Sequence, residues 1–111
     1  MEPWSVSYFR SADGRSRVTD EIDTFGVKPA AKVYLTIDLL IDYGTSLSGK
    51  YTKHIAGRIW ELRIDRYRVL YFTYTGRRFV MLRAFIKKSQ RTPLDEIRIA
   101  EDRMQQVTRS T

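Results

Sequence analysis

The chain has 111 residues, 42% of them hydrophobic, with no cysteine and a formal net charge of +7. This length fits a single domain over residues 1–111, and no apolar run approaches the ~20 residues that span a bilayer, so no membrane partner is expected. The lack of cysteine excludes disulfides and thiolate metal sites, and residues 1–5 carry no signal-peptide pattern, which predicts a cytoplasmic location.

The first half of the chain is predicted to form one strand and two helices. Residues 4–10 alternate and are rich in aromatic and β-branched side chains, as in a half-buried strand. Apolar residues then recur at helical spacing over residues 15–25 and again over residues 29–43, and each helix is followed by a glycine that can end it. Pro29 is a favourable first residue for the second helix. Residues 45–49 are rich in serine and glycine and predict a loop.

The second half is predicted to form three strands and a last helix. Residues 58–64, 67–74 and 78–86 each alternate between two kinds of side chain. Residues 92–107 begin with threonine, proline and two carboxylates, which is typical of a helix N-terminus. The buried stripe of this helix is expected to contain Ile97, Ala100 and Met104. The order β-α-α-β-β-β-α predicts an α+β domain, with a mainly antiparallel sheet and helices packed on one face.

Positive charge is concentrated between the first long loop and the last helix. Residues 50–91 carry 12 basic and 2 acidic side chains, whereas residues 1–49 carry 5 and 7 and residues 92–111 carry 3 and 4. A block of like charge repels itself, and phosphate backbones are the commonest partner that offsets it. The distribution therefore predicts a nucleic-acid partner, and the alternative is a basic face that only promotes solubility.

The predicted turns set the register of the three strands. Two-residue turns at residues 65–66 and 75–76 would place Arg63 opposite Arg68 and Arg68 opposite Arg83, in one row. A three-residue second loop would instead move Arg83 to the opposite face. Like charges on adjacent strands destabilise a sheet, so the row calls for an anion, either a phosphate or Glu61 on the same face.

The same register divides the strands into two faces. One is almost wholly apolar and is expected to form the core under the helices: Trp60, Leu62, Ile64, Val69, Tyr71, Val80, Leu82, Ala84 and Ile86. The other is expected to be exposed, with phenylalanines between the basic residues. Phe72, Phe79 and Phe85 could stack on RNA bases there, or else pack within the domain.

Three separate motifs resemble one known family. They are residues 59–63 (IWELR), 67–72 (YRVLYF) and 85–93 (FIKKSQRTP). In this order they resemble the phage-derived Gp49-like or HigB-like branch of the RelE/ParE toxin superfamily, and the resemblance covers nearly the whole chain. It implies a RelE-like fold and a toxin of a type II toxin–antitoxin system that acts as a ribosome-dependent mRNA endonuclease. It also implies a cognate antitoxin, often one with a helix-turn-helix domain.

The resemblance also implies site residues. Arg63, Arg68, Lys87 and Lys88 match basic positions of the family's catalytic face, and Arg83 and Lys53 are further matches. Some relatives carry a polar catalytic residue directly after the position of Phe85, where this chain has apolar Ile86.

These residues suit metal-independent RNA cleavage by attack of the 2′-OH. Arginines at positions 63, 68 and 83 could clamp the scissile phosphate. A lysine among like charges favours its neutral form, so a lysine at position 53, 87 or 88 could transfer a proton, and the sequence leaves open which one. His54 and Arg58 are expected to contact RNA, although His54 could equally be an exposed loop residue. No residues at metal-ligand spacing surround this single histidine, so no metal or cofactor is expected.

Two other functions remain open at this point. A ParE-like toxin would bind a DNA topoisomerase and cleave nothing. A non-catalytic RNA-binding or phage-derived module would need the basic and aromatic side chains but no proton transfer.

Overall fold

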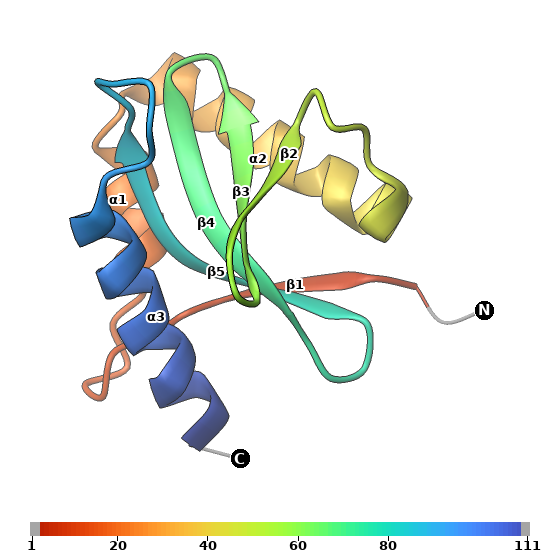
Figure 1. The fold of residues 1–111 in the computed structure, drawn as a ribbon, viewed down its shortest axis with the longest axis vertical. Helices are drawn as coiled ribbons and strands as arrows, with labels where there is room; N and C mark the ends of the chain where they lie inside the picture. The colour runs from red at the N-terminus through yellow and green to blue at the C-terminus, as the bar shows by residue number, and fades with distance from the viewer. Residues whose placement is uncertain (1–2, 110–111) are drawn as a thin grey trace.

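The computed structural model describes residues 3–109, and these residues form one five-stranded sheet with helices on both sides (Figure 1). The elements in chain order are β1 (Ser5–Tyr8), α1 (Arg17–Asp23), α2 (Val27–Tyr43), a short 3-10 helix η1 (Gly44–Ser46), β2 (Thr52–Ala56), β3 (Ile59–Ile64), β4 (Tyr67–Tyr74), β5 (Arg78–Ile86) and α3 (Leu94–Arg109). The predicted α+β class and the predicted helices are confirmed. None of the helices in the described part of the chain is long and apolar enough to cross a membrane.

The strands lie in the order β1-β5-β4-β3-β2, with β1 parallel to β5 and every other pair antiparallel. The sequence did not predict β2. This strand lies at the edge of the sheet, and its polar residues Thr52, Lys53 and His54 show no apolar alternation. Charged side chains are common on edge strands because they discourage pairing with other chains.

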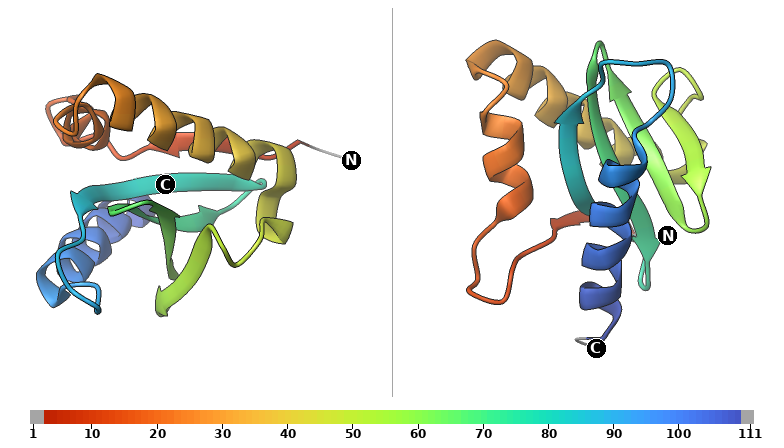
Figure 2. Two further views of the ribbon diagram at one scale, coloured as in Figure 1. Left: turned by 90° about the horizontal axis from the view of Figure 1, so that it is seen from above. Right: turned by 60° about the vertical axis from the view of Figure 1, so that its left-hand side comes forward.

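The prediction that all helices cover one face is wrong. Helices α1 and α2 lie on one side of the sheet and α3 lies on the other (Figure 2). The physical reason is the composition of the central strands, because residues 67–72 of β4 are all buried and so both faces need a cover. Ala100 of α3 is fully buried, and Ile97 and Met104 pack beside it, as the stripe predicted.

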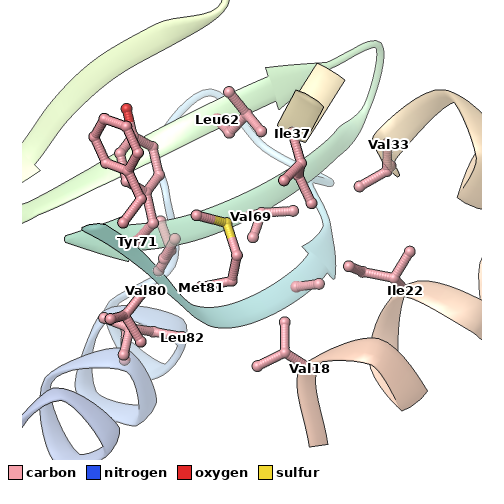
Figure 3. Close-up of a cluster of buried hydrophobic side chains, with 14 of the residues drawn as sticks. Val18, Ile22, Val33, Ile37, Leu62, Val69, Tyr71, Val80, Met81 and Leu82 are labelled. Carbon is pink, nitrogen blue, oxygen red and sulfur yellow. The ribbon is translucent and has the colours of Figure 1, made fainter. Parts of the chain in front are cut away.

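The side of the core under α1 and α2 is formed by aliphatic side chains from both helices. Val18 and Ile22 of α1 and Val33 and Ile37 of α2 face the sheet around Val69 (Figure 3). Two predicted core residues lie at the margins of this layer. Trp60 is 40% exposed beside η1, and Ile86, the last residue of β5, is 38% exposed.

The register of β3 on β4 agrees with the prediction, and the register of β4 on β5 does not. Arg63 lies opposite Arg68 across a two-residue turn. The second loop has three residues, and a β-bulge follows near Leu82, which has no partner on β4. These two shifts add up, so that Phe85 rather than Arg83 lies opposite Arg68. The predicted row of three arginines therefore contains only two.

Candidate active site

Four basic side chains gather near the end of the sheet where β3 turns into β4, and we call them the basic cluster: Lys53, Arg63, Arg68 and Lys87. Arg63 and Arg68 are cross-strand partners, Lys53 is on the adjacent strand β2, and Lys87 directly follows β5. Arg63, Arg68 and Lys87 line an open depression of about 670 Å³, which Lys88 also lines. Strands fix the two arginines, so the cluster is held by the most rigid part of the fold.

A fully buried carboxylate lies beneath the basic cluster. Glu61 of β3 is 0% exposed, and its Oε2 accepts a 2.6 Å hydrogen bond from the Thr92 hydroxyl. Its Oε1 lies 3.5 Å from Nε of Arg68 and 4.0 Å from Nε of Arg63, and has no hydrogen-bond donor within residues 3–109. A buried charge is tolerated only beside opposite charge, so Glu61 and the arginines depend on one another.

Arg68 is the most constrained member of the basic cluster. Its side chain is 10% exposed, and Nη1 donates hydrogen bonds to the backbone carbonyls of Asp65 (2.6 Å) and Tyr67 (2.9 Å). Burial lowers the pKa of Arg68 most, the nearby Arg63 lowers it further, and Glu61 opposes both effects. An arginine nevertheless remains charged in proteins, so Arg68 presents a fixed positive charge in a preset orientation.

Lys87 is the lysine whose proton affinity the site perturbs. Burial lowers the pKa of Lys87, and the charges of Arg68, Arg63 and Lys53 lower it further, while Glu61 raises it. The backbone N–H of Lys87 donates a 2.7 Å hydrogen bond to the carbonyl of Arg66, which holds this segment against the β3–β4 turn. The neutral form of Lys87 is therefore easier to reach than that of an isolated lysine.

Arg83 lies outside the basic cluster, contrary to the prediction. The bulge places it opposite Leu70, where Nη1 donates to Glu21 of α1 and Nε donates to Glu96 of α3, each at 2.7 Å. Burial alone would lower the pKa of Arg83, but the two carboxylates raise it above its usual value. Two nitrogens of this guanidinium group already bind protein carboxylates, so Arg83 is a structural link and not a free phosphate ligand.

Glu21 extends this link around the edge of β5. Its carboxylate also binds Arg103 of α3, at 2.9 Å, and accepts a 3.1 Å hydrogen bond from the backbone N–H of Ala84. Arg103 in turn donates to the carbonyl of Leu82. Helices on opposite faces of the sheet are thus joined by one set of ion pairs.

The predicted base-stacking platform is not exposed. Phe72, Phe79 and Phe85 are 0%, 1% and 5% exposed, because α3 covers one face and the three-residue β4–β5 loop turns Phe79 toward the other. Phe79 stacks on Trp4 with ring centroids 4.7 Å apart. These rings belong to the core, which is the alternative that the sequence left open.

His54 and Arg58 also lie away from the basic cluster. His54 pairs with Trp60 across the strands, so both project to the face opposite Glu61, and its Nε2 lies 2.8 Å from the carbonyl oxygen of Gly57. Arg58 lies at the other end of β3, where its Nη2 donates to the carbonyl of Thr73. The predicted site residues therefore separate into the basic cluster with Lys88 and several residues that lie elsewhere.

Comparison with known proteins places the chain in a family. Residues 20–105 match the family described as phage derived protein Gp49-like (DUF891). The chain belongs to the Gp49-like family. No curated protein matches it significantly.

The fold of this Gp49-like chain also has a solved counterpart. A chain in the crystal structure of the toxin–antitoxin complex RelBE2 from Mycobacterium tuberculosis superposes with a TM-score of 0.55. The two chains share 16% sequence identity, and the match covers 78% of this chain and 100% of the other. The fold is RelE-like, and the family resemblance drawn from the three motifs is confirmed.

From the sequence, Glu61 was expected on the exposed face of the sheet, whereas it is fully buried. Thr92 was not expected to be its partner. Glu61 is one of only two acidic residues among the 14 charged residues of positions 50–91, and it lies two positions after Ile59, which is fully buried on the same strand. That isolation was the available signal for a buried counter-charge. The contact with Thr92 joins residues 31 positions apart, and no local pattern reports it.

Proposed function

We propose that this Gp49-like protein is the toxin of a type II toxin–antitoxin system and cleaves mRNA on the ribosome without a metal ion. The observation that carries the proposal is the basic cluster over a fully buried Glu61. Such an arrangement concentrates fixed positive charge at one open depression, where a phosphodiester can enter. The proposed partners are mRNA, the ribosome and a cognate antitoxin, and the proposed location is the cytoplasm.

The two arginines are proposed to stabilise the transition state. Attack of the 2′-oxygen on phosphorus builds negative charge on the two non-bridging oxygens. Arg63 is partly exposed and Arg68 is fixed by backbone carbonyls, so together they offer one adaptable and one preset guanidinium. Charge-assisted contacts of this kind are worth several kcal/mol when they strengthen in the transition state.

The proton transfers are proposed to involve Lys87. The 2′-OH must lose a proton, and the departing 5′-oxygen must gain one, which leaves a 2′,3′-cyclic phosphate and a 5′-hydroxyl. Neutral Lys87 can accept the first proton, because its neighbours lower its pKa. Lys88, which lines the same depression, and Lys53 on β2 are the proposed sources of the second proton. Glu61 is inaccessible, and its proposed role is to hold the arginines in place.

The test is induced expression in a bacterial host, followed by mapping of RNA 5′ ends. We expect growth arrest and new ends within a translated message, whereas a copy that lacks its start codon stays intact. Arg68→Gln should abolish both effects, and Arg98→Gln, which changes a side chain that is 76% exposed on α3, should not. Inhibited DNA supercoiling with intact messages would instead indicate a topoisomerase-binding toxin, and absence of toxicity would indicate a non-catalytic module. Co-expression of the adjacent reading frame should restore growth if that frame encodes the antitoxin.

A further inference from the structure

A second group of arginines lies at the other end of the sheet, and we call them the hairpin arginines: Arg58, Arg77 and Arg78. Arg58 lies in the β2–β3 turn, and Arg77 and Arg78 lie at the β4–β5 turn. Both turns are at the end of the sheet that is remote from the β3–β4 turn (Figure 1). Arg58, in the turn just before β3, and Arg63 on β3 are five positions apart, which corresponds to about 17 Å at ~3.3 Å per residue of extended chain. One phosphate therefore cannot contact both groups.

The hairpin arginines have no carboxylate partner within residues 3–109. By contrast, Arg15, Arg17, Arg83 and Arg103 all form ion pairs with acidic side chains of the same domain. Like charges repel one another, and no carboxylate of residues 3–109 forms an ion pair with these three arginines.

Aromatic rings hold these arginines in place. Arg58 lies 5.0 Å from the centroid of Phe72, Arg77 lies 4.3 Å from that of Trp4, and Arg78 lies 5.3 Å from that of Tyr74. Stacking fixes the plane of a guanidinium and leaves its outward Nη groups for a ligand. In Arg58, Nη2 already donates to the carbonyl of Thr73. The Nε atoms of Arg77 and Arg78 are buried without an acceptor in the described part of the chain, so hydrogen bonds of the fold do not explain their position.

We propose that the hairpin arginines form a second contact for the phosphodiester backbone of RNA, separate from the basic cluster. Planar guanidiniums fixed against aromatic rings are suited to phosphates, because their paired N–H groups match the oxygens of that group. Both basic groups have the same sign, so one polyanion can occupy them together. The inference rests on the proposed function only for the identity of the ligand as RNA.

The test compares two double variants of the full-length chain that lose the same charge. Arg58→Gln with Arg78→Gln removes two hairpin arginines, and Arg15→Gln with Arg98→Gln removes two arginines that lie elsewhere and have acidic partners. Binding of a 2′-O-methylated 20-nucleotide RNA, which cannot be cleaved, is measured from 50 to 300 mM KCl. We expect the hairpin variant to bind at least tenfold more weakly, with a plot of log affinity against log salt that is shallower by about 1.4, since each phosphate contact contributes about 0.7.

Several outcomes would overturn the inference. One is an unchanged salt slope in a hairpin variant whose urea midpoint shows that it is folded, and another is an equal loss in the control pair. A third is polyglutamate of the same charge binding with the same dependence on the two arginines, which would indicate an acidic protein as the partner. The proposed function fails separately: if the wild type cleaves no message but shows the arginine-dependent salt slope, this contact stands without the endonuclease.

Discussion

The hydroxyl of Thr92 donates a 2.6 Å hydrogen bond to the buried carboxylate of Glu61, and so the segment leading into α3 is tied to the middle of β3. This contact connects the helix that covers one face of the sheet to the counter-charge of the basic cluster. The positions of Arg63 and Arg68 therefore depend on Thr92, which acts on them through Glu61.

Replacement of Thr92 by valine tests this contact. Thr92→Val keeps the shape of the side chain but leaves Oε2 of Glu61 without its donor. We expect a loss of about 1–3 kcal/mol in the free energy of unfolding, which is the cost of an unsatisfied buried polar group. Urea denaturation measures it. Thr24→Val is the control, because the Thr24 hydroxyl bonds an exposed carbonyl, and its effect should stay within about 0.5 kcal/mol.

Arg83 is predicted to support the fold and not the chemistry. Arg83→Met removes the partner of Glu21 and Glu96, whose side chains are 17% and 18% exposed. We expect a loss of about 2 kcal/mol, less than for a fully buried pair because solvent still reaches all three groups. Cleavage per folded molecule, measured below the unfolding transition, should stay within about threefold of wild type. A loss as large as that of Arg63→Met would return Arg83 to the catalytic residues.

The pH dependence of cleavage should report Lys87. The pKa of Lys87 is lowered, so its neutral, proton-accepting form grows as pH rises through that pKa, and the rate should rise with it. Lys87→Arg should lower the rate and remove the rising limb, because arginine does not lose its proton in this range. Single-turnover cleavage on ribosomes between pH 6 and 9 measures the limb. Lys88→Arg is the neighbouring control, and if it alone removes the limb, Lys88 is the base.

The lowered pKa of Lys87 also makes the stability of the fold depend on pH. The unfolded chain holds the Lys87 proton to a higher pH than the folded chain does, so between the lowered pKa and about 10.4 the unfolded state binds more protons. In that window this residue makes folding more favourable as pH rises. Urea midpoints of the wild type and of Lys87→Met should therefore converge with increasing pH.

Gly44 is predicted to be the least replaceable of two glycines with positive φ. At Gly44, where φ is 58°, a Cβ would clash with the indole of Trp4, whereas at Gly57, where φ is 53°, it would meet open space. Both alanine variants bear the backbone cost of about 1 kcal/mol, but only Gly44→Ala adds an overpacking cost of about 1–3 kcal/mol. The difference between their urea midpoints, together with Trp4 fluorescence, measures the clash.

Local patterns were enough for the helices and for the β3–β4 hairpin. The apolar spacing around Val18, Ile22 and Ile37 identified α1 and α2, and a two-residue turn fixed Arg63 opposite Arg68. Asp65 takes a positive φ in that turn, which aspartate tolerates better than most residues. Short-range geometry therefore located two of the four residues of the basic cluster.

Non-local structure was beyond those patterns. The three-residue β4–β5 loop and the bulge near Leu82 both shift the register of β5, so alternation along β5 alone misplaced Phe79 and Arg83. The phenylalanines of β4 and β5 were expected to be exposed because the sequence of a strand does not show which element will cover its face. The cover over Phe72 and Phe85 is α3, the 16-residue helix that follows β5. Arg83 and Glu21, 62 positions apart, met only in the folded state.

The carboxylate of Glu21 also occupies part of an unpaired strand edge. The pairing of β1 with β5 ends at Met81, so the rest of β5 borders no strand on that side and its backbone is open to addition of a strand from another chain. Glu21 occupies the N–H of Ala84 there, and its ion pairs with Arg83 and Arg103 place charge along the same border. The residue that joins the two helical layers therefore also places charge at this border, and charge on a strand edge discourages edge-to-edge pairing with another chain.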